Sequence, residues 1–153
     1  MRIPRAGHAL ARGLVNRVRD VRELIVVLVI ACVVEVSLRR STLPATTQRL
    51  GITLDTTGGS EALSRACASP MLAVTARRQV RAVQLVMRCW PFGDTCLRRC
   101  LVLGQRLRRV DPVLVIGVRR TTPGEVAAHS WLVAGGQSLD PTSRLFMALR
   151  DRP

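Results

Sequence analysis

The hydrophobic pattern of the chain changes its period at Pro112. Before this proline, apolar residues recur at the three- and four-residue spacing of a helix face, above all in 71–89 and 96–107. After it, 113–119 and 126–133 are short, mostly apolar runs separated by glycine-containing turns, which is typical of strands. Helices followed by strands predict an α+β fold, here an N-terminal helical half packed on a small antiparallel sheet.

The segment from Leu10 to Arg40 contains no proline and predicts one long helix, preceded by a loose stretch over 1–9. Between Leu24 and Val34 it is apolar all round, so we expect burial against several elements or against a partner. These 11 residues are too few to cross a bilayer, which needs about 20 in a helix. We therefore expect no membrane-spanning segment.

The stretch 41–60 is rich in turn residues and predicts a long connection with one short helix near 46–50. Two helices should follow, over 61–67 and 71–89. Ser69 is the expected N-cap of the second, with Pro70 at its first position.

Length and composition exclude several classes of protein. The 153 residues fit a single domain over 1–153. The net charge of +14 comes from 24 basic residues that are all arginine, a bias that we attribute to coding composition. Stacking aromatics are scarce and no recognition motif is present, so we do not expect a nucleic-acid partner.

The five cysteines, at 32, 67, 89, 96 and 100, are odd in number and lack the spacing of a secreted disulfide framework. This number and spacing of cysteines is more typical of a protein in a reducing compartment. We therefore expect a cytoplasmic protein.

Three residues have the order of a cysteine-nucleophile triad. Cys96 should lie in the first turn of a helix capped by Asp94 or Thr95, where backbone amides lower a thiol pKa. His129 is the only histidine besides His8, and the glycine pair at 135–136 should fold the chain back so that Asp140 meets it across neighbouring strands. Nucleophile, base and a carboxylate that fixes the base's tautomer predict a Cys96, His129, Asp140 triad.

Other uses of these residues stay open. Cys96 could be an ordinary buried thiol, and Cys100, one turn along the same face, is the fallback nucleophile. A metal site built from Cys89, Cys96, Cys100 and His129 lacks the paired Cys-x2-Cys turns of structural zinc. No glycine-rich phosphate loop is present. We therefore expect neither a metal nor a cofactor.

The residues around the triad resemble one family. Cys-Leu-Arg-Arg-Cys-Leu at 96–101, the apolar run ending Ile-Gly-Val-Arg at 113–119 and Ala-His-Ser-Trp at 128–131 are similar to the leader peptidase of lasso-peptide biosynthesis, the transglutaminase-like B protein. The resemblance is strongest from Trp90 to Asp140 and continues upstream only in an amphipathic helix and an Arg-Leu-Gly at 49–51. Family members usually have Ser where Cys100 stands and often an acidic residue where Val133 stands.

The resemblance implies a papain-like cysteine peptidase that separates the leader from the core of a ribosomally made precursor peptide. It also implies a leader-recognition protein, which we expect to be a separate partner, and an ATP-using macrolactam cyclase that acts on the freed core. Two alternatives remain: acyl transfer to an amine by the same triad, and a non-catalytic scaffold that assembles precursor and cyclase.

Overall fold

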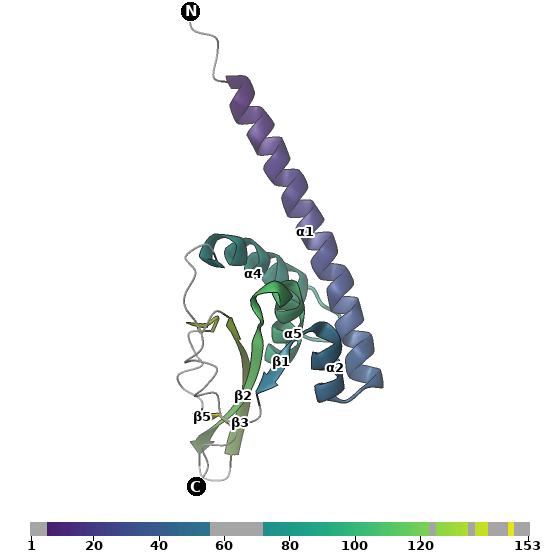
Figure 1. The fold of residues 1–153 in the computed structure, drawn as a ribbon, viewed down its shortest axis with the longest axis vertical. Helices are drawn as coiled ribbons and strands as arrows, with labels where there is room; N and C mark the ends of the chain where they lie inside the picture. Colours follow the sequence, from purple (N-terminus) through teal and green to yellow (C-terminus); the bar gives the residue numbers. More distant parts are fainter. Residues whose placement is uncertain (1–5, 56–71, 123–124, 135–136, 141–146, 149–153) are drawn as a thin grey trace, which may run out of the picture.

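The structure, a computed structural model, describes residues 6–55, 72–122, 125–134, 137–140 and 147–148. Its helical elements are α1 (Ala6–Arg40), α2 (Leu43–Leu50), α4 (Leu72–Arg88), α5 (Cys96–Arg106) and the short 3-10 helix η1 (Arg108–Val110). Its strands are β1 (Thr53–Asp55), β2 (Val113–Thr122), β3 (Glu125–Ala134), β4 (Gln137–Ser138) and β5 (Met147–Ala148). Helices gather on one side of a small sheet, which confirms the predicted α+β fold (Figure 1).

The sheet is mixed rather than purely antiparallel, which corrects part of the prediction. Its strand order is β1-β2-β3-β4, and β5 pairs with β2 further along the strand than β1 does. The β2–β3 and β3–β4 pairs are antiparallel hairpin neighbours, as expected, but β1 runs parallel to β2. Parallel strands need a long crossover, and the chain between β1 and β2 supplies one that contains α4 and α5.

The short strand β1 was not predicted, because three residues inside a turn-rich stretch are too few to show the hydrophobic periodicity of a strand. The short helix before it was predicted, and it extends from Leu43 to Leu50. Pro44 opens this helix and Gly51 ends it with a left-handed backbone (φ 68°), which glycine adopts without strain. The helix expected over 61–67, the cap at Ser69 and Pro70 and the glycine turn at 135–136 lie outside the described residues.

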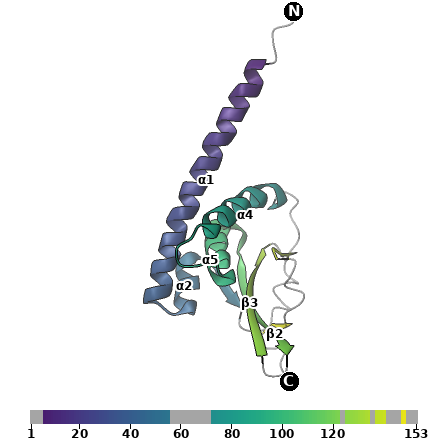
Figure 2. The same cartoon turned by 180° about the vertical axis from the view of Figure 1, so that it is seen from behind.

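Helix α1 begins at Ala6 rather than at the predicted Leu10 and ends at Arg40 as predicted, so residues 6–9 are helical. Its N-terminal part extends beyond the other helices, as two opposite views show (Figures 1 and 2). Only one face of its apolar segment is buried, through Val27, Ile30, Ala31 and Val34. Of the two expectations for this segment, burial within the chain is therefore found for one face only, and burial of the other face against a partner stays a prediction. None of the helices described is both long and apolar enough to span a membrane.

The main core lies between the helices and the sheet. Leu101 and Val102 of α5 pack against Leu114 of β2 and Leu132 of β3. Gly104 allows this close approach, because a Cβ atom there would lie 2.7 Å from the Ile52 side chain. Helix α5 is thus held directly against the sheet.

Two ion pairs fix α5 to α1. Arg98, in the first turn of α5, donates from Nε to Glu35 Oε2 at 2.9 Å, and Arg106, at its other end, donates to Glu23 at 2.5 Å. Arg98 also lowers the pKa of Glu35 through this hydrogen bond, against the opposing effect of burial. The helix that carries Cys96 is therefore held at both ends.

Candidate active site

Cys96 is the first residue of α5, as the sequence predicted. Of the two caps considered, Thr95 is the one observed: its hydroxyl oxygen accepts from the Arg98 backbone N–H at 3.3 Å. The Arg99 N–H donates to the Thr95 carbonyl at 3.1 Å. Because a helix has no internal acceptors for its first N–H groups, those of Cys96 and Leu97 remain beside the sulfur.

The structure brings His129 and Asp140 together. His129 lies on β3, and Asp140 follows β4, which pairs with β3 through Val133 and Ala134. The Leu139 N–H continues this pairing with a 2.9 Å hydrogen bond to the Leu132 carbonyl. As a result, His129 Nε2 lies 2.6 Å from Asp140 Oδ2.

Cys96 completes the cluster and has a lowered thiol pKa. Burial opposes ionisation of this half-buried sulfur, but hydrogen bonds from the side chain and backbone of Ser130 and from His129 outweigh it, and the pKa falls below its ordinary value. Because Asp140 occupies Nε2 of the imidazole, Nδ1 is the nitrogen left to face the sulfur. This geometry favours a thiolate beside an imidazolium.

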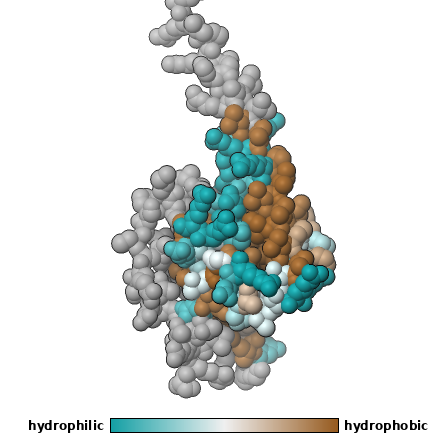
Figure 3. Space-filling model, turned by 45° about the vertical axis from the view of Figure 1, so that its right-hand side comes forward, coloured by the Kyte–Doolittle hydropathy of each residue, from teal (hydrophilic) through white to brown (hydrophobic). Residues whose placement is uncertain are grey.

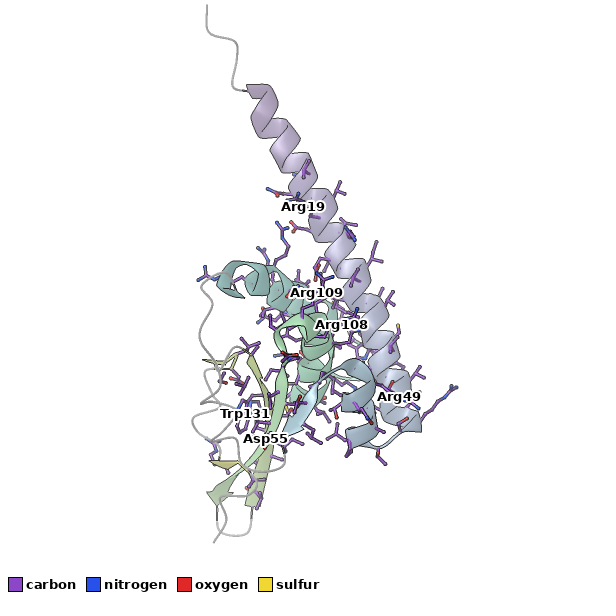
Figure 4. All side chains as sticks on the ribbon, in the orientation of Figure 1. Arg19, Arg49, Asp55, Arg108, Arg109 and Trp131 are labelled. Atoms are coloured by element: carbon purple, nitrogen blue, oxygen red, sulfur yellow. The ribbon has the colours of Figure 1, made fainter. Side chains whose placement is uncertain are left out.

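The surroundings of His129 favour the protonated form of its imidazole. Burial opposes its protonation, but hydrogen bonds to Asp140 and to Cys96 outweigh burial and raise the pKa of His129. Trp131 stacks on the ring, with centroids 6.2 Å apart and planes at 25°. Trp131 itself is buried against Val115 and Val133 on the sheet face opposite the main core, where Figure 4 labels it. The ring that would act as base is therefore held on three sides.

Cys100 differs from Cys96 in every respect that matters for reactivity. It is buried, its Sγ lies 3.3 Å from the Ser130 carbonyl oxygen, and burial raises its pKa to about 12. A thiol of this kind stays protonated at neutral pH. The site therefore favours Cys96 over the fallback nucleophile.

Ser130 is a site residue that the sequence analysis quoted only as part of a motif. It is buried between the two cysteines, and its hydroxyl is the first of the groups that lower the pKa of Cys96. Among the residues described, no nitrogen or oxygen atom hydrogen-bonds to Ser130 Oγ, so the hydroxyl is available to the sulfurs, and its hydrogen bond also lowers the pKa of Cys100 against the larger effect of burial. Its position next to the histidine on a strand was the only signal in the sequence.

A cavity of ≈ 230 Å³ adjoins the cluster and includes Cys96, His129 and Asp140 in its wall. The rest of its wall is mostly apolar, includes Val80 and Val83 of α4, Leu103 of α5 and Trp131 and Leu132 of β3, and also contains Arg99. Asp94 and Arg99 form an ion pair beside it. A cavity of this size can take a side chain of a peptide laid across the thiol.

The other described cysteines are not part of this cluster. Cys32 and Cys89 are exposed, and the four cysteines that the structure describes are all free thiols. Within the same described residues, no group of three or more His, Cys, Asp or Glu side chains is arranged to hold a metal ion.

Comparison with known proteins gives one match. The sequence model of the transglutaminase-like superfamily matches residues 37–146, which include α2, the cavity, Cys96, His129 and Asp140. No curated protein and no solved structure matches the chain.

Proposed function

Because the chain belongs to the transglutaminase-like superfamily, we propose that it is a cysteine peptidase in which Cys96, His129 and Asp140 form the catalytic triad. The observation that carries the proposal is the cluster itself. A thiol of lowered pKa starts a helix, hydrogen-bonds to His129, and the imidazole is held from its other side by Asp140 at 2.6 Å. These are the three parts that nucleophilic catalysis by a thiol requires.

In the first step, the Cys96 thiolate attacks the scissile carbonyl carbon and forms a tetrahedral intermediate. Its oxyanion lies at the start of α5, where the N–H groups of Cys96 and Leu97 point out of the helix and the helix dipole is positive. Preorganised donors of this kind typically contribute about 10²- to 10³-fold to the rate.

In the second step, the carbon–nitrogen bond breaks and the departing amine takes the proton of the His129 imidazolium. The acyl group remains on Cys96 as a thioester. His129, now neutral, takes a proton from water as the water attacks the thioester, and the products are a free carboxylate and the restored thiolate–imidazolium pair. Asp140 holds the ring through Nε2 in both steps.

We further propose that the substrate is a ribosomally made lasso precursor peptide, cut between leader and core. Support comes from the motifs at 96–101, 113–119 and 128–131, which resemble the lasso leader peptidases. On this proposal a separate leader-recognition protein delivers the precursor, and an ATP-using cyclase closes the core once its amine is free.

The test is cleavage of the precursor peptide encoded beside the gene, with and without the recognition protein, followed by mass spectrometry. We expect a leader fragment with a free carboxylate, and no cleavage by Cys96→Ala although that variant still binds the peptide. A leader fragment that ends in a new amide would show that the enzyme transfers the acyl group to an amine instead of hydrolysing it. Full maturation of the precursor in the presence of Cys96→Ala would show that the protein acts as a scaffold and not as a peptidase.

A further inference from the structure

A second apolar face runs along α1 on the side away from the domain. It comprises eight side chains that are between 47% and 61% exposed: Val15, Val18, Val21, Ile25, Leu28, Val29, Val33 and Val36. At 3.6 residues per turn these positions lie on one side of the helix, opposite the buried Val27, Ile30 and Val34. We call these eight residues the outer face of α1. The space-filling view shows the hydrophobic surface that follows this helix (Figure 3).

The outer face has the spacing of a helix-pairing surface. Val18, Val21, Ile25 and Leu28 alternate three- and four-residue steps, and Cys32 continues the series. From Val15 to Val36 the face is about 30 Å long at 1.5 Å per residue. A contiguous exposed apolar surface of this length is unusual for a domain that has no partner.

The charges around the outer face have one sign. The acidic residues of α1 are Asp20, Glu23 and Glu35, and they pair with Arg78, Arg106 and Arg98 of the helices α4 and α5. The arginines of the described part of α1 therefore set the charge beside the outer face. Within residues 15–36 they are Arg17, Arg19 and Arg22, of which Figure 4 labels Arg19 on the extended part of the helix. Arg39 and Arg40 follow the face, and Arg39 pairs with Glu35.

We propose that the outer face of α1 is the docking surface for an amphipathic helix of a partner protein, one whose apolar stripe is flanked by Asp and Glu. The apolar residues supply the buried contact, and the arginines select an acidic partner. A second copy of this chain fits poorly, because it would oppose arginines to arginines on molecules of net charge +14. A lipid surface fits less well, since α1 has no aromatic residue and the face is mostly valine.

The outer face of α1 and Cys96 lie on different helices, so docking needs no chemistry at Cys96. Binding to the outer face is expected to be unchanged in Cys96→Ala. Failure of the peptidase proposal and failure of the docking proposal are therefore separate results.

The experiment uses the full chain and two synthetic helical peptides long enough to span residues 15–36. Both carry the same Ile and Leu heptad stripe, flanked by Glu in one and by Lys in the other. Fluorescence anisotropy should show the Glu-flanked peptide binding at least about tenfold more tightly, with affinity falling as salt is added. Ile25→Glu, at a position 57% exposed, should weaken that binding about tenfold or more.

The matched control is Val126→Glu, the same kind of change at an exposed residue of β3, which should bind like the unmodified chain. Arg22→Glu changes only the charge beside the face and should abolish the preference for the Glu-flanked peptide. The proposal is overturned if the two peptides bind equally or not at all. Self-association in sedimentation, or binding to phosphatidylserine vesicles, that Ile25→Glu abolishes would assign the face to a second copy or to a membrane instead.

Discussion

Asp140 lies with its Oδ2 atom 2.6 Å from Nε2 of His129, although Asp140 is not itself on a strand. It is placed by the turn after β4, where its backbone N–H donates to the Ser138 hydroxyl oxygen at 3.2 Å and its carbonyl accepts from that hydroxyl at 2.9 Å. The carboxylate is therefore positioned by a short turn that is fixed to the β3–β4 pair. Substitutions in this turn should alter the position and the pKa of the imidazole directly.

Replacing Asp140 tests how the carboxylate acts on the base. Asp140→Asn keeps an oxygen that can accept from Nε2–H but removes the charge that raises the pKa of His129. The imidazolium should then lose its proton at lower pH, so the alkaline limb of the kcat/KM profile should move to lower pH. Asp140→Ala also loses the orientation of the ring, and kcat should fall on the order of 10²-fold. An alkaline limb that stays in place in both variants would remove Asp140 from the triad.

The two cysteines of α5 should differ sharply toward an alkylating agent. The pKa of Cys96 is lowered and that of Cys100 is raised to about 12, so Cys96 carries a larger fraction of thiolate than Cys100 at any pH below the ordinary thiol pKa. Iodoacetamide at about pH 6, below the ordinary thiol pKa, should label Cys96 before the exposed Cys32 and Cys89, and Cys100 last. Peptide mapping by mass spectrometry measures the order. Labelling of Cys96 at the rate of Cys32 would show that its thiol is not activated.

Ser130→Ala tests the buried hydroxyl beside the sulfur. Without it, the thiolate loses a hydrogen bond, so the pKa of Cys96 should rise and its alkylation should need higher pH. The matched control is Cys100→Ala. Cys100 lies 3.3 Å from the Ser130 carbonyl oxygen and also receives a hydrogen bond from the Ser130 hydroxyl. Cys100→Ala removes this second sulfur but keeps the hydroxyl beside Cys96, so the titration of Cys96 should not move to higher pH. Equal shifts in both variants would point to a general packing effect.

The Glu35 ion pair should contribute stability that depends on pH. The pKa of Glu35 is lowered in the folded chain by its hydrogen bond to Arg98, so this contribution is present above the unfolded-state pKa near 4.5 and is lost as pH falls through the folded-state value. Glu35→Gln should lower the free energy of unfolding by about 2 kcal/mol at neutral pH. Urea unfolding at pH 7 and at about pH 3 should show the difference between the two proteins shrinking in acid. A difference of the same size at both pH values would mean that the charge of Glu35 does not account for its contribution to the stability of the fold.

Much of the candidate site could be predicted from the sequence because its parts are encoded locally. A capping threonine starts the helix at Cys96, and the short, mostly apolar run at 126–133 forms the strand that carries His129. Caps, turns and periodicity act between near neighbours, so they can be read from residues a few positions apart. The α+β class follows from the same signals.

Only the tertiary structure decided which faces and partners these elements acquired. The parallel pairing of β1, the ion pair between Glu35 and Arg98, and the Ser130 contacts join residues whose sequence distance gives no local signal. The same holds for α1, where an evenly apolar sequence was divided into a buried and an exposed face by where α4 and α5 pack. Local rules determine what each segment becomes, while burial and charge pairing depend on which surfaces the folded chain brings together.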